Sequence, residues 1–509
     1  MARKVRGSKG QTLLDAMRSV FPNAEAPCGG SGRCGRCRVR IRVVGRSLET
    51  PLSPADVEEA RLLGPRDADD GWRLACRTRF ERDGTVWAEQ EERAFFLPEQ
   101  EGNVRRTSGD RSGLCAAVDL GTTTIACVFA EPADGRILAS AAEANRQRSY
   151  GPDVVSRIAY AVQGPEQLKE LSALVRGQVT GMLEKLCRMA GGTRPEKIHI
   201  CGNTTMLHFW EGADLSGLSR MPFRPGFLES RETKLADGGR LEYACRLLPG
   251  ISAFIGADIA AGIVARGLHK TPSRPELLVD IGTNGEIVLA AGGGLLATAT
   301  AAGPAFEGVS VSCGMAAVGG AVDHVEWRNG EFSYTTLGGL PPAGFCGSGL
   351  LDMLACLRRA DLLAESGALT AAPDRSGERA FSLPSDPPLR FIQADVRQLQ
   401  LAKGAIAAGI RILCRRADVP LEKIARISLA GSFGSRLSAD SALTAGLIPE
   451  ELAGRIEAAG NTALAGTLLT ARDPAMMEAC MRTARRVNVV DLSQEPDFQD
   501  AFVEAMSFP

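Results

Sequence analysis

The sequence predicts a multidomain fold in which a small α+β domain precedes a duplicated α/β domain with two lobes. Its 509 residues are too many for one ordinary domain. Four cysteines gather near the N-terminus, whereas from residue 114 onward short apolar segments alternate with long alanine-rich segments, as is typical of α/β folds. A short motif around Asp119 recurs around Asp280, which indicates an internal duplication.

Composition argues against several classes of protein. The formal net charge is -1, aromatic residues make up 5% of the chain, and no basic tract carries interleaved aromatics, so we expect no nucleic-acid partner. No apolar run approaches the ~18 residues of a membrane span, and we expect no membrane partner. Residues 1–4 lead into polar sequence and not into an apolar signal segment, so a cytoplasmic location is expected.

Changes in composition and in the predicted secondary structure along the chain predict the domain boundaries. The clustered cysteines lie in a compact N-terminal block, and a charged, irregular segment follows it. A turn-rich stretch at residues 272–275, after a predicted helix at 256–268, separates the two copies of the repeat. The expected parts are residues 1–82 (cluster domain), 83–113 (linker), 114–270 (first lobe) and 271–509 (second lobe).

The clustered cysteines predict a metal cluster. Cys28, Cys34 and Cys37 follow a C-x5-C-x2-C spacing in a glycine-rich loop, and Cys76 stands far downstream. A [2Fe–2S] cluster requires four converging thiolates, and glycines let the backbone fold closely around its sulfides. The alternative is a structural zinc site, which usually has two CxxC pairs. Only one such pair is present, and this favours [2Fe–2S].

The two copies of the repeated motif predict phosphate-binding loops. Each copy carries an aspartate at the end of an apolar strand, followed by a glycine turn and hydroxyl side chains. Backbone N–H groups in such turns bind anionic oxygens, and Asp119 and Asp280 suit water-mediated binding of Mg²⁺. One copy alone would be weak evidence for phosphate binding, because ordinary turns use the same residues. The expected phosphate-binding residues are Gly121, Thr122, Thr123, Gly282, Thr283 and Asn284.

The two loops together predict a nucleotide bound between the two lobes, and two further segments are expected at this site. Residues 427–430 form an apolar strand that runs into a glycine turn, where Gly431, Ser432 and Gly434 would line the adenosine end. Asp258, in the first turn of a small-residue helix, is expected to orient water on Mg²⁺ or the attacking water. No Walker A motif occurs, which argues against a P-loop ATPase.

An ordered series of such motifs resembles one family, the reductive activators of corrinoid enzymes. These are fusions of a ferredoxin with an ATPase of the actin, sugar-kinase and heat-shock-chaperone superfamily. The resemblance is carried by residues 74–78, 119–124, 150–154, 202–206, 280–286, 302–308, 346–349, 401–405 and 430–434. It implies an α+β ferredoxin-like [2Fe–2S] domain followed by a duplicated, actin-like (ribonuclease H-like) two-lobed ATPase.

The resemblance also implies an activity. Corrinoid methyltransferases work through Co(I), and accidental oxidation leaves inactive Co(II). The activator passes one electron from its cluster to Co(II), and ATP turnover drives this step. The implied cofactors are a [2Fe–2S] cluster, ATP and Mg²⁺. The implied partners are a corrinoid protein of a methyltransferase system and an external low-potential reductant, and a homodimer is left open.

The chain departs from the family pattern in two places. Only about ten residues precede residues 12–16, where the family usually has a β-hairpin, so either the ferredoxin-like fold is shortened there or the start site is misassigned. Longer members carry an additional domain where this chain has only residues 83–113. Two glycine-rich loops, at 302–308 and 346–349, fit either the nucleotide cleft or a partner surface.

Three other functions are compatible with the residues alone. The chain could be an ATP-gated electron donor to a non-corrinoid acceptor, or a redox-sensing ATPase that passes no electron onward. It could also be a small-molecule kinase with an appended ferredoxin, although no sugar-binding constellation stands out.

Overall fold

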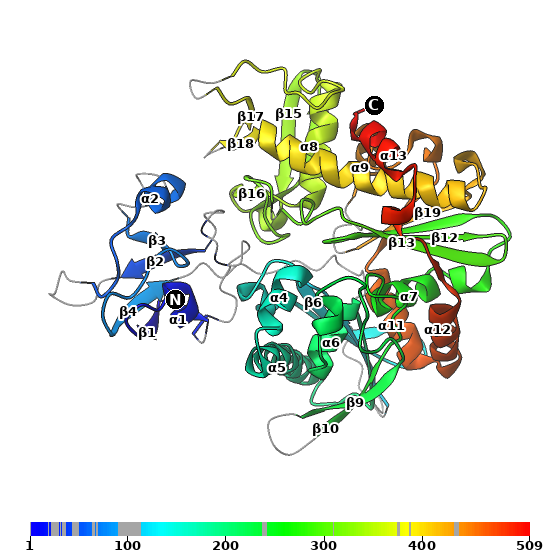
Figure 1. The fold of residues 1–509 in the computed structure, drawn as a ribbon, viewed down its shortest axis with the longest axis horizontal. Helices are drawn as coiled ribbons and strands as arrows, with labels where there is room; N and C mark the ends of the chain where they lie inside the picture. Colours follow the sequence, from blue (N-terminus) through cyan, green and yellow to red (C-terminus); the bar gives the residue numbers. More distant parts are fainter. Residues whose placement is uncertain are drawn as a thin grey trace.

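The computed structural model describes residues 2–18, 20–21, 30, 32, 37–42, 50–63, 67, 70–89, 113–236, 242–308, 310–373, 377–385, 388–431 and 437–509 (Figure 1). Four residues expected in functional sites, Cys28, Cys34, Ser432 and Gly434, lie outside these described residues. Within the described ranges, no helix combines the length and the apolar character needed to cross a bilayer.

The small N-terminal domain is a four-stranded antiparallel sheet with the order β1-β4-β2-β3. Its core is apolar and includes Val5, Leu13, Val39 and Phe80. One strand, β1, precedes the first helix and pairs with β4. Its elements are β1 (Arg3–Gly7), α1 (Leu13–Met17), β2 (Arg38–Arg42), α2 (Val57–Leu63), β3 (Trp72–Leu74) and β4 (Gly84–Glu89).

Strand β4 falls in the segment expected to be a linker. Residues 84–89 pair with both β1 and β2, so they complete this sheet instead of leaving it. Val86 and Ala88 are buried while Thr85 and Trp87 are exposed, which is the alternation of a strand with one face on a core. From the sequence, these residues were assigned to the linker, because the alternation is short and charged residues follow it.

The first lobe is built on a six-stranded sheet with the order β7-β6-β5-β8-β10-β9. Its strands are β5 (Cys115–Leu120), β6 (Thr124–Ala130), β7 (Ile137–Ala144), β8 (Lys197–Gly202), β9 (Arg231–Ala236) and β10 (Glu242–Leu247). Its helical segments are η1 (Arg146–Ser149), α4 (Val154–Ala161), α5 (Pro165–Met189), α6 (Thr204–Glu211), η2 (Ser216–Leu218), α7 (Ala257–Ala265) and η3 (Leu268–Lys270).

The second lobe repeats this plan with the order β20-β19-β11-β12-β13-β21. Its strands are β11 (Glu276–Ile281), β12 (Gly285–Ala291), β13 (Gly294–Thr300), β19 (Arg426–Ala430), β20 (Ile456–Gly460) and β21 (Asn488–Val489). Smaller sheets contain β14 (Ala321–Arg328), β15 (Glu331–Thr336), β16 (Gly344–Phe345), β17 (Ala380–Leu383) and β18 (Leu389–Ile392). The helical segments are η4 (Leu337–Gly339), α8 (Gly347–Arg359), α9 (Gln393–Arg416), η5 (Leu421–Lys423), α10 (Ala439–Thr444), η7 (Glu450–Leu452), α11 (Thr462–Arg472), α12 (Pro474–Arg486), η8 (Leu492–Gln494) and α13 (Phe498–Met506).

The duplication expected from sequence is present in the strand pairing. In each lobe, an antiparallel meander begins with the aspartate-bearing strand, β5 or β11. The same strand has a parallel neighbour on its other side, β8 in the first lobe and β19 in the second. This shared topology is the ribonuclease H-like arrangement, and it places Asp119 and Asp280 at equivalent strand ends.

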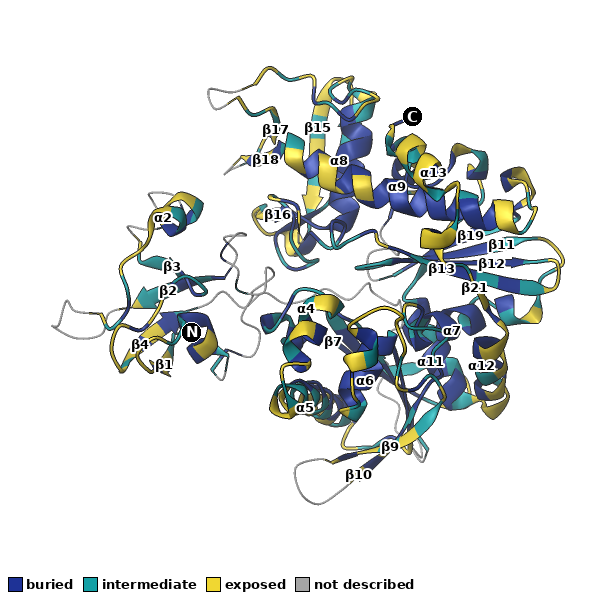
Figure 2. Cartoon of the chain, viewed as in Figure 1, coloured by how far each residue is buried: buried dark blue, intermediate teal, exposed yellow. Residues whose placement is uncertain are grey.

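Helices α7 and α11 join the two lobes. Although α11 lies between the second-lobe strands β20 and β21 in sequence, its residues Leu464 and Leu468 pack with Cys115 and Val128 of the first sheet. Gly466 lets the two helices cross closely, because a Cβ there would lie 1.9 Å from the carbonyl oxygen of Ala261. Figure 1 shows the lobes one above the other with these helices between them, and Figure 2 shows that strands β11 and β12 of the second lobe are largely buried.

Candidate functional site

Four carboxylates converge where the two lobes meet. Asp119 lies near the end of β5, Asp258 in the first turn of α7, and Asp280 near the end of β11. Glu286 on β12 stands directly opposite Asp280 in the strand register. Asp258 is close enough to Asp119 for the charge of one to raise the pKa of the other, and Asp280 is affected by both. The duplication therefore brings the expected acidic residues into one buried site.

The burial of these carboxylates is unfavourable while they are all charged. Burial first, and the neighbouring carboxylates second, raise the pKa of Asp258 to about 7 and the pKa of Asp280 to about 8. Burial also raises the pKa of Asp119 and Glu286, although Asn461 donates a 2.8 Å hydrogen bond to Asp119 that lowers its pKa. A divalent cation between these groups would relieve the repulsion.

The donor set suits a hard cation that keeps its waters. Among the described residues, no three His, Cys, Asp or Glu side chains already form a metal-binding group. Mg²⁺ is usually bound by one or two carboxylates, several waters and the phosphates of a substrate. The cluster of Asp119, Asp258, Asp280 and Glu286 therefore fits Mg²⁺ bound together with a nucleotide.

The expected phosphate loops of the two lobes lie close together, since both contact the same carboxylate of Glu307. At the first loop, a Cβ on Gly121 would lie 2.3 Å from the carbonyl oxygen of Thr124, so the tight turn requires glycine. The Thr122 hydroxyl accepts a 2.8 Å hydrogen bond from Asn203. At the second loop, the Gly282 N–H donates a 2.9 Å bond to the Asn284 carbonyl, which closes a matching turn.

Glu307 connects these two loops. Its carboxylate accepts a 2.7 Å hydrogen bond from the Thr123 hydroxyl and 3.0 Å bonds from the Thr283 hydroxyl. Burial raises its pKa, while the bonds from the two threonines oppose that rise. Residue 307 of the segment 302–308 thus lies between the two expected phosphate loops, which favours the first of the two roles that the sequence left open.

Arg157 on α4 supports the first loop from behind. Its side chain is fully buried, and its guanidinium donates to the Thr122 carbonyl at 2.7 Å and to the Gly151 carbonyl at 2.9 Å. Burial, and to a lesser degree Arg148, lowers its pKa to about 9. Neither Arg157 nor Glu307 was assigned a role from the sequence, although Arg157 follows closely on the motif at 150–154 and Glu307 lies within the motif at 302–308.

The expected adenosine end is only partly described. Gly431 follows β19 with a φ of 108°, and a Cβ there would lie 2.4 Å from the Ile281 carbonyl and 3.0 Å from a carboxylate oxygen of Asp280. Glycine is therefore required where β19 ends beside the second phosphate loop. Ser432 and Gly434 fall outside the described residues and stay predictions.

Two of the four expected cluster ligands can be placed, and they meet. The Sγ atoms of Cys37 and Cys76 are 3.1 Å apart, and the Cys76 N–H donates to the Cys37 sulfur at 3.4 Å. Such a pair of sulfurs, with a backbone donor beside them, suits two thiolates of one iron–sulfur cluster. Cys28 and Cys34 lie outside the described residues.

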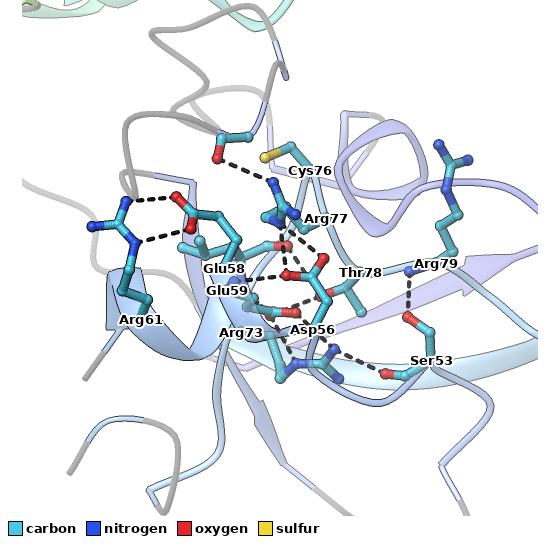
Figure 3. Close-up of polar contacts among 12 residues, drawn as sticks. Ser53, Asp56, Glu58, Glu59, Arg61, Arg73, Cys76, Arg77, Thr78 and Arg79 are labelled. Atoms are coloured by element: carbon cyan, nitrogen blue, oxygen red, sulfur yellow. Dashed lines mark hydrogen bonds and ion pairs between the residues drawn. The ribbon is translucent and has the colours of Figure 1, made fainter. Parts of the chain in front are cut away.

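A buried carboxylate holds the turn that carries Cys76 (Figure 3). Glu59 on α2 is 1% exposed and accepts a 2.7 Å hydrogen bond from the Leu74 N–H. It also pairs with Arg73 at 2.9 Å and accepts from the Thr78 hydroxyl at 3.2 Å. These bonds fix the backbone on both sides of Cys76.

Comparisons with known proteins agree with this arrangement. The profile of a "2Fe-2S iron-sulfur cluster binding domain" matches residues 2–81, the "RACo middle region" matches 114–271, and the "C-terminal domain of RACo the ASKHA domain" matches 274–509. Corrinoid activation enzyme RamQ of Eubacterium limosum is 30% identical over 414 residues, covering 76% of this chain and 69% of RamQ. The chain belongs to this family of corrinoid activation enzymes.

Two further relatives of the corrinoid activation enzymes cover different shares of the chain. The Co(II) methylated amine-specific corrinoid protein reductase of Methanosarcina barkeri is 25% identical over 309 residues, which are 54% of this chain and 55% of the reductase. The solved structure of a reductive activator for corrinoid,iron-sulfur protein is 25% identical, has a TM-score of 0.71, and covers 99% of this chain and 96% of that one. The expected ferredoxin-like and actin-like fold is confirmed, and the matched domains assign an iron–sulfur cluster and ATP to the family fold.

Proposed function

We propose that this protein is an ATP-dependent reductive activator that passes one electron to the Co(II) form of a corrinoid protein and so restores Co(I). The observation that carries the proposal is that one chain, a member of the corrinoid activation enzymes, contains both paired cluster cysteines and a buried acidic site between two lobes. The cobalt gains one electron and the protein loses one, which an external low-potential reductant replaces.

The cluster domain has a defined part in this proposal. Cys28, Cys34, Cys37 and Cys76 would hold a [2Fe–2S] cluster, which supplies single electrons at low potential when bound. The Glu59 carboxylate keeps the Cys76 turn in place. The neighbouring arginines of β2 are engaged within the domain, since Arg38 pairs with Asp67 and Arg42 pairs with Glu89 at 2.6 Å.

The cleft residues have equally specific parts. Asp119 and Asp280 would bind Mg²⁺ through its waters, and Asp258 would orient a water molecule. The loops at 121–123 and 282–284 would donate to the phosphates, and Gly431, Ser432 and Gly434 would line the adenosine end. Because Thr123 and Thr283 come from different lobes, phosphate binding to both would draw the lobes together.

Two finer points belong to the same proposal. The proposed division is residues 1–82, 83–113, 114–270 and 271–509, with one change. Strand β4 moves from the second part to the first, because it completes the sheet of the small domain. A homodimer is left open, and sedimentation velocity of the purified chain tests it.

The deciding experiment follows cobalt directly. The protein, prepared without oxygen, is mixed with a Co(II) corrinoid protein from the same organism and a low-potential reductant, and the Co(I) absorption band is recorded with and without Mg-ATP. We expect Co(I) only with ATP. In Asp280→Asn the rate should fall about ten- to a hundred-fold, as for other groups that orient a metal.

The matched control is Asp134→Asn, which changes an exposed carboxylate in the turn after β6 and should leave the rate unchanged. The proposal fails if the cluster is reduced and ATP is hydrolysed, yet no native corrinoid protein yields Co(I).

A further inference from the structure

The small domain touches the first lobe through Arg18, the residue that ends α1. Its guanidinium donates to the Ser149 carbonyl and lies 4.4 Å from the centre of the Tyr150 ring. Asp15, one turn earlier, holds the guanidinium at 2.8 Å. Arg18 also lies only ten positions before Cys28 in the chain.

The surface that receives Arg18 is rigidly built. The Tyr150 and Tyr160 rings pack with their centres 5.0 Å apart, and both hydroxyls donate to Glu170, at 2.7 and 2.6 Å. Arg18 and Asp15 are close enough to Tyr160 to act on its pKa, which burial and Glu170 raise to about 12. An aromatic face held in this way is well suited to bind a guanidinium.

One connection runs from this surface to the first phosphate loop through Asn145. Ser149 ends η1, and Asn145 caps the start of the same short helix. Asn145 is 1% exposed, and its side chain donates to the Gly121 carbonyl at 2.9 Å while its N–H donates to the Thr123 carbonyl at 2.9 Å. A shift of the loop therefore moves the helix whose last carbonyl binds Arg18.

A second connection passes through Arg157. This buried guanidinium binds the Gly151 carbonyl, next to Tyr150, and the Thr122 carbonyl in the phosphate loop. Both connections end on residues 121–123, and they use different side chains. The motif at 150–154, which the nucleotide site itself does not employ, gains a role in this way.

We propose that the corner formed by Ser149 and Tyr150 is the docking site for the ferredoxin-like domain, and that phosphate binding at residues 121–123 weakens this docking. The inference deepens the proposed function, because it explains how the nucleotide could control where the cluster is presented. In the docked arrangement the Thr123 hydroxyl is bound to Glu307. A phosphate that takes this hydroxyl displaces the loop and, through Asn145 and Arg157, the corner.

Thermodynamic linkage gives a sharp test. If phosphate binding weakens docking, docking weakens phosphate binding by the same factor. Replacing Arg18 should therefore strengthen nucleotide binding, although Arg18 lies in the other domain. We expect Arg18→Ala and Tyr150→Leu each to lower the Kd of a non-hydrolysable ATP analogue about five-fold, the low end of typical coupling. The double variant should show no further change, because both substitutions break one contact.

The matched control is Arg61→Ala in the same domain. Arg61 is 67% exposed and pairs with Glu58 on its own helix, so its loss removes the same charge without affecting docking. Hydrogen exchange supplies the second readout. The analogue should speed exchange at residues 146–150 in the wild type, and Arg18→Ala should do so without nucleotide. Iron content, measured in parallel, shows that the cluster is retained.

The inference is overturned if Arg18→Ala leaves the Kd where Arg61→Ala leaves it, or raises it, or if exchange at 146–150 does not respond. These outcomes are separate from the test of function. If Co(I) forms but Arg18→Ala has no effect on nucleotide binding, the activator function stands and the docking site is disproved. If Arg18→Ala changes nucleotide binding but no Co(I) forms, the docking site stands and the activator function is disproved.

Discussion

At the residue scale, Glu307 is the side chain whose removal should be most informative. Both threonine hydroxyls of the facing loops donate to its carboxylate, so it sets the spacing of the loops. In Glu307→Ala we expect kcat for ATP hydrolysis to fall about a hundred-fold, since small displacements of positioning groups have effects of that size. Steady-state hydrolysis at saturating ATP measures this.

Glu307→Gln is the graded control for that prediction. An amide keeps one oxygen acceptor and nearly the same volume, so kcat should lie between the wild type and Glu307→Ala. Equal rates for all three proteins would contradict the role assigned to this carboxylate.

Residues were predictable from the sequence where spacing alone carries the chemistry. Cys37 and Cys76, which the structure brings together, and the two aspartate loops have this property, because each motif is local or repeats. Glu307 and Arg157 were not predictable in the same way. Both residues are far in sequence from the loop residues that they contact. Glu307, for example, meets Thr123 only after the lobes have folded against each other. A buried charge whose partners are backbone carbonyls, like Arg157, leaves little trace in a single sequence.

At the scale of elements, the contact between β8 and α11 should make the protein sensitive to acid. His199 on β8 is 8% exposed, and its Nδ1 lies 2.9 Å from the Thr470 hydroxyl on α11. Burial, with smaller effects of Arg246 and Lys197, lowers its pKa from 6.5 to about 4. Between pH 6.5 and 4 the unfolded chain therefore binds a proton that the folded chain does not, and stability falls as the pH falls through this range.

The corresponding variant is His199→Gln. As the pH falls from 6.5 to 5, the unfolding temperature of the variant should fall less than that of the wild type. The variant lacks the histidine whose protonation in the unfolded chain costs the wild type up to about 3 kcal/mol of stability between pH 6.5 and 4. Scanning calorimetry at several pH values measures the slope. Thr470→Val, which loses the hydrogen bond but adds no titrating group, should lower stability equally at each pH. A His199→Gln slope identical to the wild-type slope would disprove the assignment.

Elements were predictable where the pattern is strong. The apolar strands that carry Asp119 and Asp280 were expected, and they form. Strand β4 was assigned to the linker, because its alternation spans only residues 84–89 and charged residues follow it. The position of α11 over the first sheet could not be read from the chain either. Its apolar residues fit many surfaces, and the choice depends on the close crossing with α7 at Gly466.

At the scale of the whole molecule, the three largest apolar cores of the described residues correspond to the three successive parts of the chain. One core belongs to the small domain, and two larger ones belong to the two lobes. The sequence predicted this order, because composition and motifs change between the parts. It did not predict the contact between Arg18 and Tyr150, since a single cation on an aromatic ring has no signature in spacing.

Separate cores imply that the two activities can be lost separately. Cys76 lies in the small domain beside Cys37, whereas the acidic cleft is built by the lobes. In Cys76→Ser we therefore expect the visible absorption of the cluster and ATP-dependent Co(I) formation to disappear, while ATP hydrolysis stays within about two-fold of the wild type, as for independent sites. Cys187→Ser, which changes a thiol of the first lobe, should leave both activities intact. Loss of hydrolysis in Cys76→Ser would mean that the cleft depends on the cluster for its structure, and the separation of cores would then not extend to function.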